Sequence, residues 1–330
     1  MSSGVSISQD RTYLVTGGAG VIGSHLTRRI AAAGGRVRVL DDFSTGHRHN
    51  VEGIEGNVEI VEADMRDATA VGRAMAGVDY VLHEAAMSSV PRSLEDPAGT
   101  SEINLIGTIT LLEAARRAGV RCFVAASSSA VYGEQDIEIK TETLPSEPIS
   151  PYGASKLAAE EYYQTYSRSL GLPTVALRYF NVFGPSQDPA SAYAAVLPRF
   201  MKAYASGEPP TIYGDGEQSR DFTFIDNVVD ANLLACEAEA AWGKVINVAC
   251  GGSITVNDLA RVVREVMGVT IEPNHVDERA GDIRHSRADI GRARELLGYE
   301  PRVDFREGIE KTVQWYTTQD AGCQAGGSSS

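Results

Sequence analysis

The chain has 330 residues, of which 43% are hydrophobic and 22% are charged. The length suggests two cooperating units. The composition is typical of a soluble globular protein and excludes long disorder. The formal net charge of -14 would repel a phosphate backbone over most of the surface, so we expect no nucleic-acid partner.

The N-terminal segment MSSGVSISQD is polar and lacks the apolar run of a signal peptide, and no later stretch is long and apolar enough to span a membrane. We therefore expect a cytoplasmic protein without membrane contact. Cys122, Cys236, Cys250 and Cys323 form no CxxC pair, and the histidines lack the spacing of metal ligands. Reduced thiols and no metal site are expected.

Short β-branched runs alternate with helical patterns through the first half of the chain. The expected strands are residues 13–16, 37–40, 58–61, 80–83, 122–126 and 174–178, and helical spacing is clearest at 22–33 and 102–118. This alternation predicts an α/β fold, a doubly wound parallel-sheet Rossmann domain with right-handed crossovers. Ligands of such sheets bind at the carboxyl ends of the strands.

After residue 178, loops rich in Gly, Pro and Asp separate shorter helices. We expect residues 179–223 and 249–316 to form a smaller α/β substrate-binding domain. Residues 224–248 include a strand-like run and are expected to return to the first domain, which covers residues 8–178. Residues 317–330 end in GGSSS and are expected to be disordered.

A glycine-rich loop, GGAGVIG, follows the first expected strand and opens the first helix. Gly17 and Gly20 permit a tight turn in which backbone N–H groups approach a pyrophosphate, and Gly23 allows close packing of the helix on the sheet. The pattern predicts a dinucleotide site, and a glycine-rich turn without a ligand is the alternative.

The second strand ends in Asp41 and Asp42, at the spacing where a carboxylate accepts hydrogen bonds from the adenosine ribose. A carboxylate there disfavours a 2′-phosphate, so NAD is expected rather than NADP. Asp41 is the preferred ribose contact, and Asp42 could be a solvated loop residue. Asp64 and Met65 are expected at the adenine amino group, although an acidic residue that caps a helix would look the same.

Tyr152 and Lys156 lie four residues apart in PYGASK, and hence on one face of a helix. A neighbouring cation and the positive nicotinamide ring would lower the pKa of the phenol and let Tyr152 take a hydroxyl proton. The segment SSSAVYG follows the fifth strand at the edge where the nicotinamide is expected. Such a pair, or a serine-rich turn, also occurs by chance, but the order and spacing of these elements agree.

At these residues the chain resembles the extended short-chain dehydrogenase/reductase family, and specifically its UDP-hexose 4-epimerases. The resemblance covers roughly residues 11–312 and includes LDDFSTG, HEAA, RYFNVFGP, YGDGEQSRDF and RAGDIRHSRAD. It implies that Ser128 hydrogen-bonds the reacting hydroxyl, that Tyr152 is the catalytic base and that Lys156 also holds the nicotinamide ribose. It also suggests a homodimer formed through helices near residues 102–118 and 154–169.

These patterns and the resemblance give two sets of binding residues. The cofactor-binding set is Gly17, Gly20, Val21, Ile22, Gly23, Asp41, Asp42, Phe43, Ser44, Thr45, Gly46, Asp64, Met65, Ala85, Ala86, Asn104, Ser127, Tyr152, Lys156 and Tyr179. The substrate-binding set is Ser88, Ser89, Ser128, Ser129, Tyr152, Asn181, Val196, Leu197, Phe200, Ile212, Tyr213, Arg220, Arg279, Asp282 and Ser286.

Within the substrate set, the resemblance implies that Asn181, Arg220 and Arg279 bind a diphosphate and that Asp282 binds the uridine ribose. Ordinary surface charges are the alternative, although arginine loops in an acidic protein favour an anion clamp. The apolar members of the set are expected to flank the uracil, though such spacing is also typical of a core.

The resemblance implies a cycle in which Tyr152 deprotonates the sugar 4-OH, hydride passes to NAD, and a 4-keto sugar turns over before the hydride returns. Ser129 and Ala130 stand where dehydratases and decarboxylases need an acid, which favours epimerisation. Ser286 stands where a bulky aromatic residue restricts some epimerases to simple hexoses. We therefore expect interconversion of UDP-GlcNAc and UDP-GalNAc, with UDP-Glc and UDP-Gal also accepted.

Two alternatives stay open. A UDP-glucuronate 4-epimerase remains possible if Arg92 or Arg178 meets a carboxylate. A noncatalytic NAD-binding sensor or scaffold would keep the glycine loop, but the intact Ser128, Tyr152 and Lys156 count against it.

Overall fold

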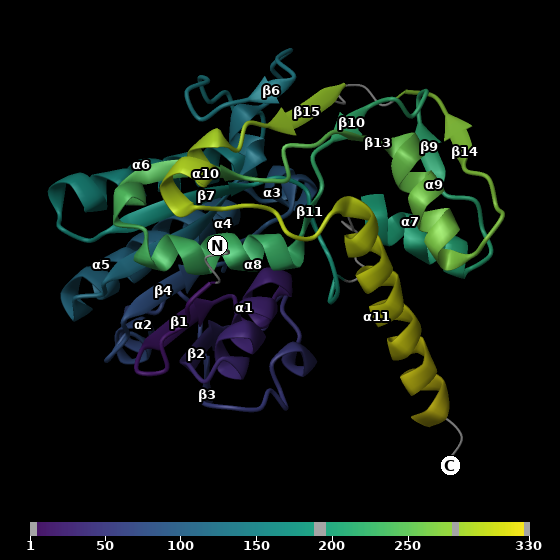
Figure 1. Ribbon diagram of the computed structural model, residues 1–330. Coiled ribbons are helices and arrows are strands. Elements are labelled where there is room, and N and C mark those ends of the chain that lie inside the picture. Colours follow the sequence, from purple (N-terminus) through teal and green to yellow (C-terminus); the bar gives the residue numbers. More distant parts are fainter. Residues whose placement is uncertain (1–4, 188–195, 279–283, 327–330) are drawn as a thin grey trace.

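The structure, a computed structural model, describes residues 5–187, 196–278 and 284–326 (Figure 1). Its centre is a seven-stranded sheet in the order β12-β7-β5-β4-β1-β2-β3, in which every pairing is parallel. The strands are β1 (Thr12–Thr16), β2 (Arg36–Asp41), β3 (Val58–Glu62), β4 (Tyr80–His83), β5 (Cys122–Ser128), β7 (Thr174–Tyr179) and β12 (Lys244–Val248). The doubly wound parallel sheet expected from the sequence is confirmed.

Helices cover both faces of this sheet (Figure 1). They are α1 (Val21–Ala32) and α8 (Ile225–Glu237) on one face, and α2 (Ala68–Ala74), α5 (Thr108–Ala118) and α6 (Pro151–Ser169) on the other. Successive strand residues alternate between the two cores: Val15 packs with Leu26 of α1, whereas Leu14 packs in the core that includes Leu111 of α5. The alternation explains why the strands read as continuous apolar runs.

Several short elements connect the strands and helices of the first half of the chain. These are the 3-10 turn Arg48–Asn50, α3 (Val90–Glu95), α4 (Pro97–Ser101), the π-helical turn Glu102–Gly107, the 3-10 turn Ser129–Tyr132 and β6 (Ile139–Lys140). The π-helical turn continues directly into α5, so the helix expected at 102–118 is present but changes its winding at its start.

A second sheet has the strand order β13-β10-β15-β6. Its other strands are β13 (Ile254–Thr255), β10 (Ser219–Arg220) and β15 (His285–Ala288). Strand β6 comes from the segment that the sequence assigns to the first domain, yet it pairs with β15. Conversely, β12 returns to the main sheet beside β7. The two layers are therefore interleaved in sequence, and the domain boundaries stay a prediction.

The remaining elements complete the second half of the chain. They are β8 (Val182–Phe183), α7 (Val196–Ala205), β9 (Thr211–Tyr213), β11 (Thr223–Phe224), the 3-10 turn Glu239–Ala241, α9 (Val256–Met267), β14 (Asn274–Val276), α10 (Gly291–Leu297) and α11 (Phe305–Gly326). Helix α11 projects from the body toward the C-terminus (Figure 1). Residues 317–326, for which the sequence predicts disorder, are helical, and residues 327–330 lie outside the described part. Within the described ranges, no helix is long and apolar enough to cross a membrane.

Candidate functional site

The glycine loop joins β1 to α1. It lies beside the switch point of the sheet, where β2 and β3 lie on one side of β1 and β4 begins the other side. Gly17 has a φ of 65°, and a Cβ atom on it would lie 2.6 Å from the backbone nitrogen of Ala85. A Cβ on Gly23 would lie 2.2 Å from the carbonyl oxygen of Gly17. Gly20 caps α1 without a side-chain hydrogen bond. These glycines form a tight turn, a cradle whose N–H groups suit a dinucleotide pyrophosphate, and a Cβ atom on Gly17 or Gly23 would clash with the backbone that shapes it.

Asp41 lies at the carboxyl end of β2 and is buried. Its two carboxylate oxygens accept hydrogen bonds from the N–H groups of Ala19 and Phe43, each at 2.8 Å. Burial raises the pKa of this carboxyl, and the two N–H groups oppose the shift. Asp41 thus also shapes the glycine loop, a role that the ribose prediction did not include. Asp42 is exposed and accepts from Ser44.

Asp64 and Met65 follow β3 at the same edge of the sheet. Hydrogen bonds from Arg66 are the main cause that lowers the pKa of the Asp64 carboxyl. The cap of α2 is a different residue, Asp67, whose side chain accepts from Thr69 and Ala70. Asp67, and not Asp64, therefore caps helix α2.

Asn104 lies in the π-helical turn and is buried. Its Oδ1 accepts from the N–H of Met87 at 2.7 Å, and its Nδ2 donates to the Met87 carbonyl and to Ser155 Oγ. The side chain therefore ties the loop after β4, which contains Ala85 and Ala86, to helix α6. Asn104 positions the predicted cofactor loop through Met87.

The reactive groups expected from the sequence come together where β5 ends and α6 begins. Ser150 caps α6, and a Cβ on Gly153 would lie 2.7 Å from the Ala130 carbonyl oxygen, so the start of α6 packs tightly on the turn after Ser128. Lys156 is 5% exposed, and its ammonium donates to the Ala126 carbonyl of β5 at 2.9 Å.

Burial raises the pKa of the Tyr152 phenol, and a hydrogen bond with Ser128 opposes that shift. The same residue's pKa was expected to fall because of Lys156. The Lys156 ammonium is itself turned to the Ala126 carbonyl, and burial lowers its pKa to about 8. The protein's own groups therefore leave Tyr152 protonated at neutral pH, and a further positive charge is required to ionise it.

Ser127 precedes Ser128 in β5, and its buried hydroxyl donates to Glu160. Glu160 in turn forms a buried ion pair with Arg178 at 2.7 Å. Ser127 therefore supports a structural network on one side of the strand. The same ion pair occupies Arg178, which weighs against its use for a substrate carboxylate. Arg92 stays exposed on α3.

Glu84 was not singled out by sequence reasoning, although it lies inside HEAA. Its Oε1 accepts from the Tyr179 hydroxyl at 2.8 Å, and that hydroxyl accepts from Asn232 of α8 at 2.8 Å. Its Oε2 is buried and has no hydrogen-bond partner among the described residues. Burial raises the pKa of the carboxyl to about 7, against the effects of Tyr179 and Lys156. An acid directly after an apolar strand was the available signal.

Asn181, Arg220 and Ser286 are linked through the backbone of Asp221. Asn181 follows β7 and donates to the Asp221 carbonyl at 3.1 Å. The Asp221 N–H donates to the Ser286 carbonyl at 3.1 Å, and its carboxylate accepts from Cys250 and Ala288. Asn181, which follows the main sheet, is thus tied to the end of the strand of the second sheet that contains Arg220. Asp221 is the connecting residue that sequence reasoning missed.

Three apolar members of the substrate set are core residues, since their exposed fractions are 1–3%: Leu197, Phe200 and Ile212. Val196 and Tyr213 are partly exposed. Arg279 and Asp282 lie outside the described residues. Ser89 caps α3, and its hydroxyl accepts from Arg92.

The other expected residues follow from these elements. Val21 and Ile22 open α1, Ser44, Thr45 and Gly46 follow β2, Ser88 precedes α3, and Ser129 begins the turn after β5.

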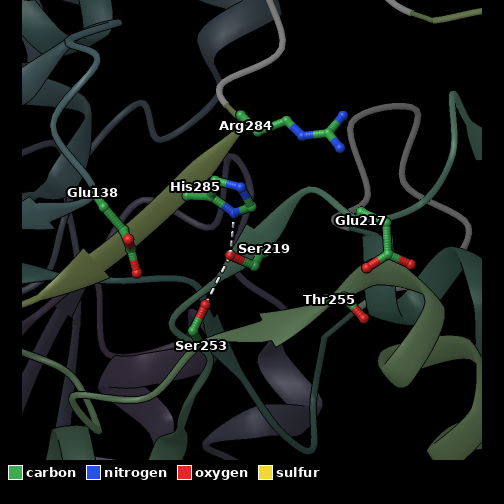
Figure 2. Close-up of a pocket in the computed structure, with 7 residues that line it drawn as sticks. All are labelled: Glu138, Glu217, Ser219, Ser253, Thr255, Arg284 and His285. Carbon is green, nitrogen blue, oxygen red and sulfur yellow. Dashed lines mark hydrogen bonds between the residues drawn. The ribbon is translucent and has the colours of Figure 1, made fainter.

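A separate polar pocket of about 450 Å³ lies on the second sheet (Figure 2). Ser253 donates to Ser219 at 2.7 Å, and Ser219 lies 2.9 Å from Nδ1 of His285. Ser219 and His285 alternate with Arg220 and Ser286 along their strands, so the two pairs face opposite sides of the sheet. Of the predicted site residues that the structure describes, none lines this pocket. Within the described ranges, no cluster of three or more acidic, histidine or cysteine residues is arranged to hold a metal.

A parallel sheet with a glycine cradle at its switch point and polar groups along the same edge defines a dinucleotide-binding protein of the Rossmann class. The sequence model described as the NAD dependent epimerase/dehydratase family matches residues 13–249. A UDP-glucose 4-epimerase of Mycolicibacterium smegmatis is 40% identical over 307 residues, which are 92% of this chain and 97% of that protein. The chain therefore belongs to the NAD dependent epimerase/dehydratase family, and NAD is its cofactor.

Solved structures agree with this assignment. The UDP-N-acetylglucosamine 4-epimerase from Methanobrevibacter ruminantium M1, in complex with UDP-N-acetylmuramic acid, has a TM-score of 0.90 and 39% identity, over 94% of this chain and 100% of that chain. The UDP-glucose 4-epimerase from Thermotoga maritima, solved with UDP-glucose, has a TM-score of 0.88 and 38% identity, over 93% and 99%.

Proposed function

We propose that this chain is an NAD-dependent UDP-hexose 4-epimerase that favours UDP-GlcNAc and UDP-GalNAc and also accepts UDP-Glc and UDP-Gal. The observation that carries the proposal is the pairing of Arg220 with the small residue Ser286 in adjacent strands. Similarity to UDP-glucose 4-epimerases supports the reaction, and similarity to a UDP-N-acetylglucosamine 4-epimerase supports a site with room for an N-acetyl group.

The cofactor is held by the cradle of Gly17, Gly20 and Gly23, with Asp41 at the ribose side. When bound, NAD accepts a hydride from carbon 4 of the sugar and returns it. Tyr152 takes the proton of the sugar 4-OH, and Ser128 hydrogen-bonds the same hydroxyl. A positive charge near the phenol offsets the burial that raises its pKa, and Lys156 lies one helical turn away.

Epimerisation requires a firmly bound nucleotide and a loosely bound hexose, because the sugar must present both of its faces. Arg220 and Asn181 bind the diphosphate in this proposal, together with Arg279, and Asp282 binds the uridine ribose. Ser286 lies beside Arg220 and leaves space at the sugar's second carbon. Of the residues expected to flank the uracil, Val196 and Tyr213 are the members with exposed surface.

The proposed substrate preference is tested by measuring kcat/KM with UDP-GlcNAc, UDP-Glc and UDP-glucuronate. We expect the highest value for UDP-GlcNAc and the lowest for UDP-glucuronate, because Arg178 is already paired with Glu160. A highest value for UDP-glucuronate would instead assign exposed Arg92 to a substrate carboxylate. Turnover of UDP-Glc alone would remove the N-acetyl preference, and bound NAD without any turnover would favour a sensor.

We also propose that two copies associate through the π-helical turn, α5 and α6. Ile106 and Tyr162, from these elements, are 54% and 40% exposed. Light scattering after size-exclusion chromatography should give a dimer mass for the wild type and a monomer mass for Ile106→Asp. The matched control is Ile137→Asp, an exposed isoleucine outside these helices, which should stay dimeric.

A further inference from the structure

Glu84 lies at the carboxyl end of β4, beside the switch point between β1 and β4. A dinucleotide crosses a doubly wound sheet at this crevice, with one half on each side. Asp41 is the last residue of β2, on the adenosine side, so the nicotinamide half belongs on the side of β4 and β5, where Tyr152 and Lys156 lie. Glu84 is therefore an acid on the nicotinamide side of the crevice.

Only one of the two carboxylate oxygens of Glu84 has a hydrogen-bond partner among the described residues. Tyr179 donates to Oε1, while Oε2 is buried without a partner among the described residues. A buried polar atom without a partner is unfavourable unless it serves a ligand or a charge. Lys156 is a nearby cation whose ammonium donates to the Ala126 carbonyl, and its charge acts on Glu84 through space.

We propose that the Glu84 carboxylate is the counter-charge of the oxidised nicotinamide and favours NAD⁺ over NADH in the bound state. In the proposed reaction the sugar C4–H bond breaks, its electron pair and hydrogen move to the nicotinamide, and the hydroxyl proton goes to Tyr152. The ring thereby loses its positive charge. A fixed negative charge beside it disfavours the reduced state and so favours the return of the hydride to the sugar.

The charged group that acts on Glu84 is Lys156 of α6. Burial and, in turn, the Glu84 carboxylate raise the pKa of three neutral phenols, Tyr152 and Tyr163 of α6 and Tyr179 of β7. Helix α8 contributes the uncharged Asn232 through Tyr179. The neighbouring His83 is held neutral by burial, which lowers its pKa to about 3. Glu160 of α6 also acts on Lys156 and Tyr163, but it is paired with Arg178. Among the described residues, Glu84 is the acid of this cluster without a cationic partner in direct contact, and it is charged only above its pKa of about 7.

The test is the midpoint potential of the bound NAD⁺/NADH couple in the holoenzyme, read from the near-ultraviolet absorbance of NADH in equilibrium with a redox dye. At about pH 8, Glu84→Gln should favour NADH about tenfold, which raises the midpoint by about 30 mV for a two-electron couple. At about pH 5 the difference should disappear, because the wild-type carboxyl is then protonated. Glu161→Gln, an exposed acid on α6, should match the wild type.

Three results would overturn the proposal. They are an unchanged midpoint in Glu84→Gln at about pH 8, a shift that persists at about pH 5, and an equal shift in Tyr179→Phe. The last variant keeps the carboxylate and removes the hydroxyl that bonds to it and to Asn232. The wild type alone gives a second test if Glu84→Gln does not fold. Proton uptake by Glu84 on reduction should steepen the midpoint beyond about 30 mV per pH unit near neutrality, and a constant slope would contradict the proposal.

The inference rests on NAD as the cofactor and, for the return of the hydride, on the proposed epimerase reaction. The midpoint is measured without UDP-sugar. A shifted midpoint in a protein that epimerises nothing would therefore reject the function and retain the role of Glu84, whereas active enzyme with an unshifted midpoint would do the reverse.

Discussion

Arg220 and Ser286 are register partners in the parallel strands β10 and β15, so their side chains lie on the same face of the second sheet. The Asp221 N–H bond to the Ser286 carbonyl holds this register. A cation suited to a diphosphate and a small hydroxyl residue are thereby fixed side by side. In the proposed function, this relationship would link nucleotide binding to the space beside the sugar.

Substitution of Ser286 by tyrosine should close that space. We expect kcat/KM for UDP-GlcNAc to fall about a hundredfold in Ser286→Tyr, while the value for UDP-Glc changes little. Ser286→Ala, which keeps the space, should turn over both substrates. An equal loss of both in Ser286→Tyr would show that this position does not select the substituent at the sugar's second carbon.

Removal of the Tyr152 hydroxyl should abolish proton transfer and leave the cofactor bound. Tyr152→Phe should lower kcat by about a thousandfold, the usual effect of losing a general base. NAD content, measured by absorbance after denaturation of the purified protein, should equal that of the wild type. Tyr162→Phe is the matched control, since Tyr162 is an exposed tyrosine of the same helix. Wild-type turnover in Tyr152→Phe would remove this residue from its role.

Asp41 should matter for stability as well as for NAD. Asp41→Ala leaves the Ala19 and Phe43 N–H groups without their acceptor, and it should lower the free energy of unfolding by about 3 kcal/mol. Urea unfolding without added NAD measures this loss. Asp42→Ala, at the exposed neighbour, should change it by less than about 1 kcal/mol. An equal loss of unfolding free energy in both variants would show that Asp41 does not shape the glycine loop.

His83 should make the protein sensitive to acid. It is buried between Thr16 and Thr108, at 2.7 and 2.9 Å, and burial lowers its pKa from 6.5 to about 3. The unfolded chain therefore binds this proton first, so the free energy of unfolding falls as pH drops below about 6.5, and the His83 contribution to this fall levels off near the folded pKa. Between about pH 7 and pH 5 the loss is about 2 kcal/mol.

The control for His83 is His83→Gln, which does not titrate and should lack this part of the acid sensitivity. Glu84 and Asp221 have raised pKa values and act in the opposite direction, so the difference between wild type and variant isolates His83. The same dependence on pH in both proteins, measured by urea unfolding, would show that His83 is not held neutral.

The spacing of sequence elements was enough to predict the parallel sheet, the glycine cradle and the meeting of Ser128 with the start of α6. Those features depend on local chemistry, namely apolar strand runs, glycine at crowded turns and a helix cap. The register of Arg220 with Ser286 could not be predicted from the sequence. It depends on the pairing of two strands that are far apart in the chain: the neighbouring partners Ser219 and His285 are 66 residues apart.

Several residues have roles other than the predicted ones, because the fold brings them against residues from other segments of the chain. Ser127 bonds to Glu160, Asn104 bonds to Met87, and Leu197 is buried in the core. A polar residue beside a reactive one looks the same in sequence whether it faces the ligand or a buried ion pair. Glu84 shows the converse, since its hydrogen bond with Tyr179 is visible only in the fold.

The most direct test of the central claim is to incubate the purified protein with UDP-GlcNAc and, separately, with UDP-GalNAc, and to follow the anomeric NMR signals. Each sugar should convert to the same mixture of both, without net consumption of NAD. Tyr152→Phe should leave both unchanged. Absence of epimerisation of UDP-GlcNAc, UDP-Glc and UDP-glucuronate by NAD-loaded wild-type protein would contradict the assignment.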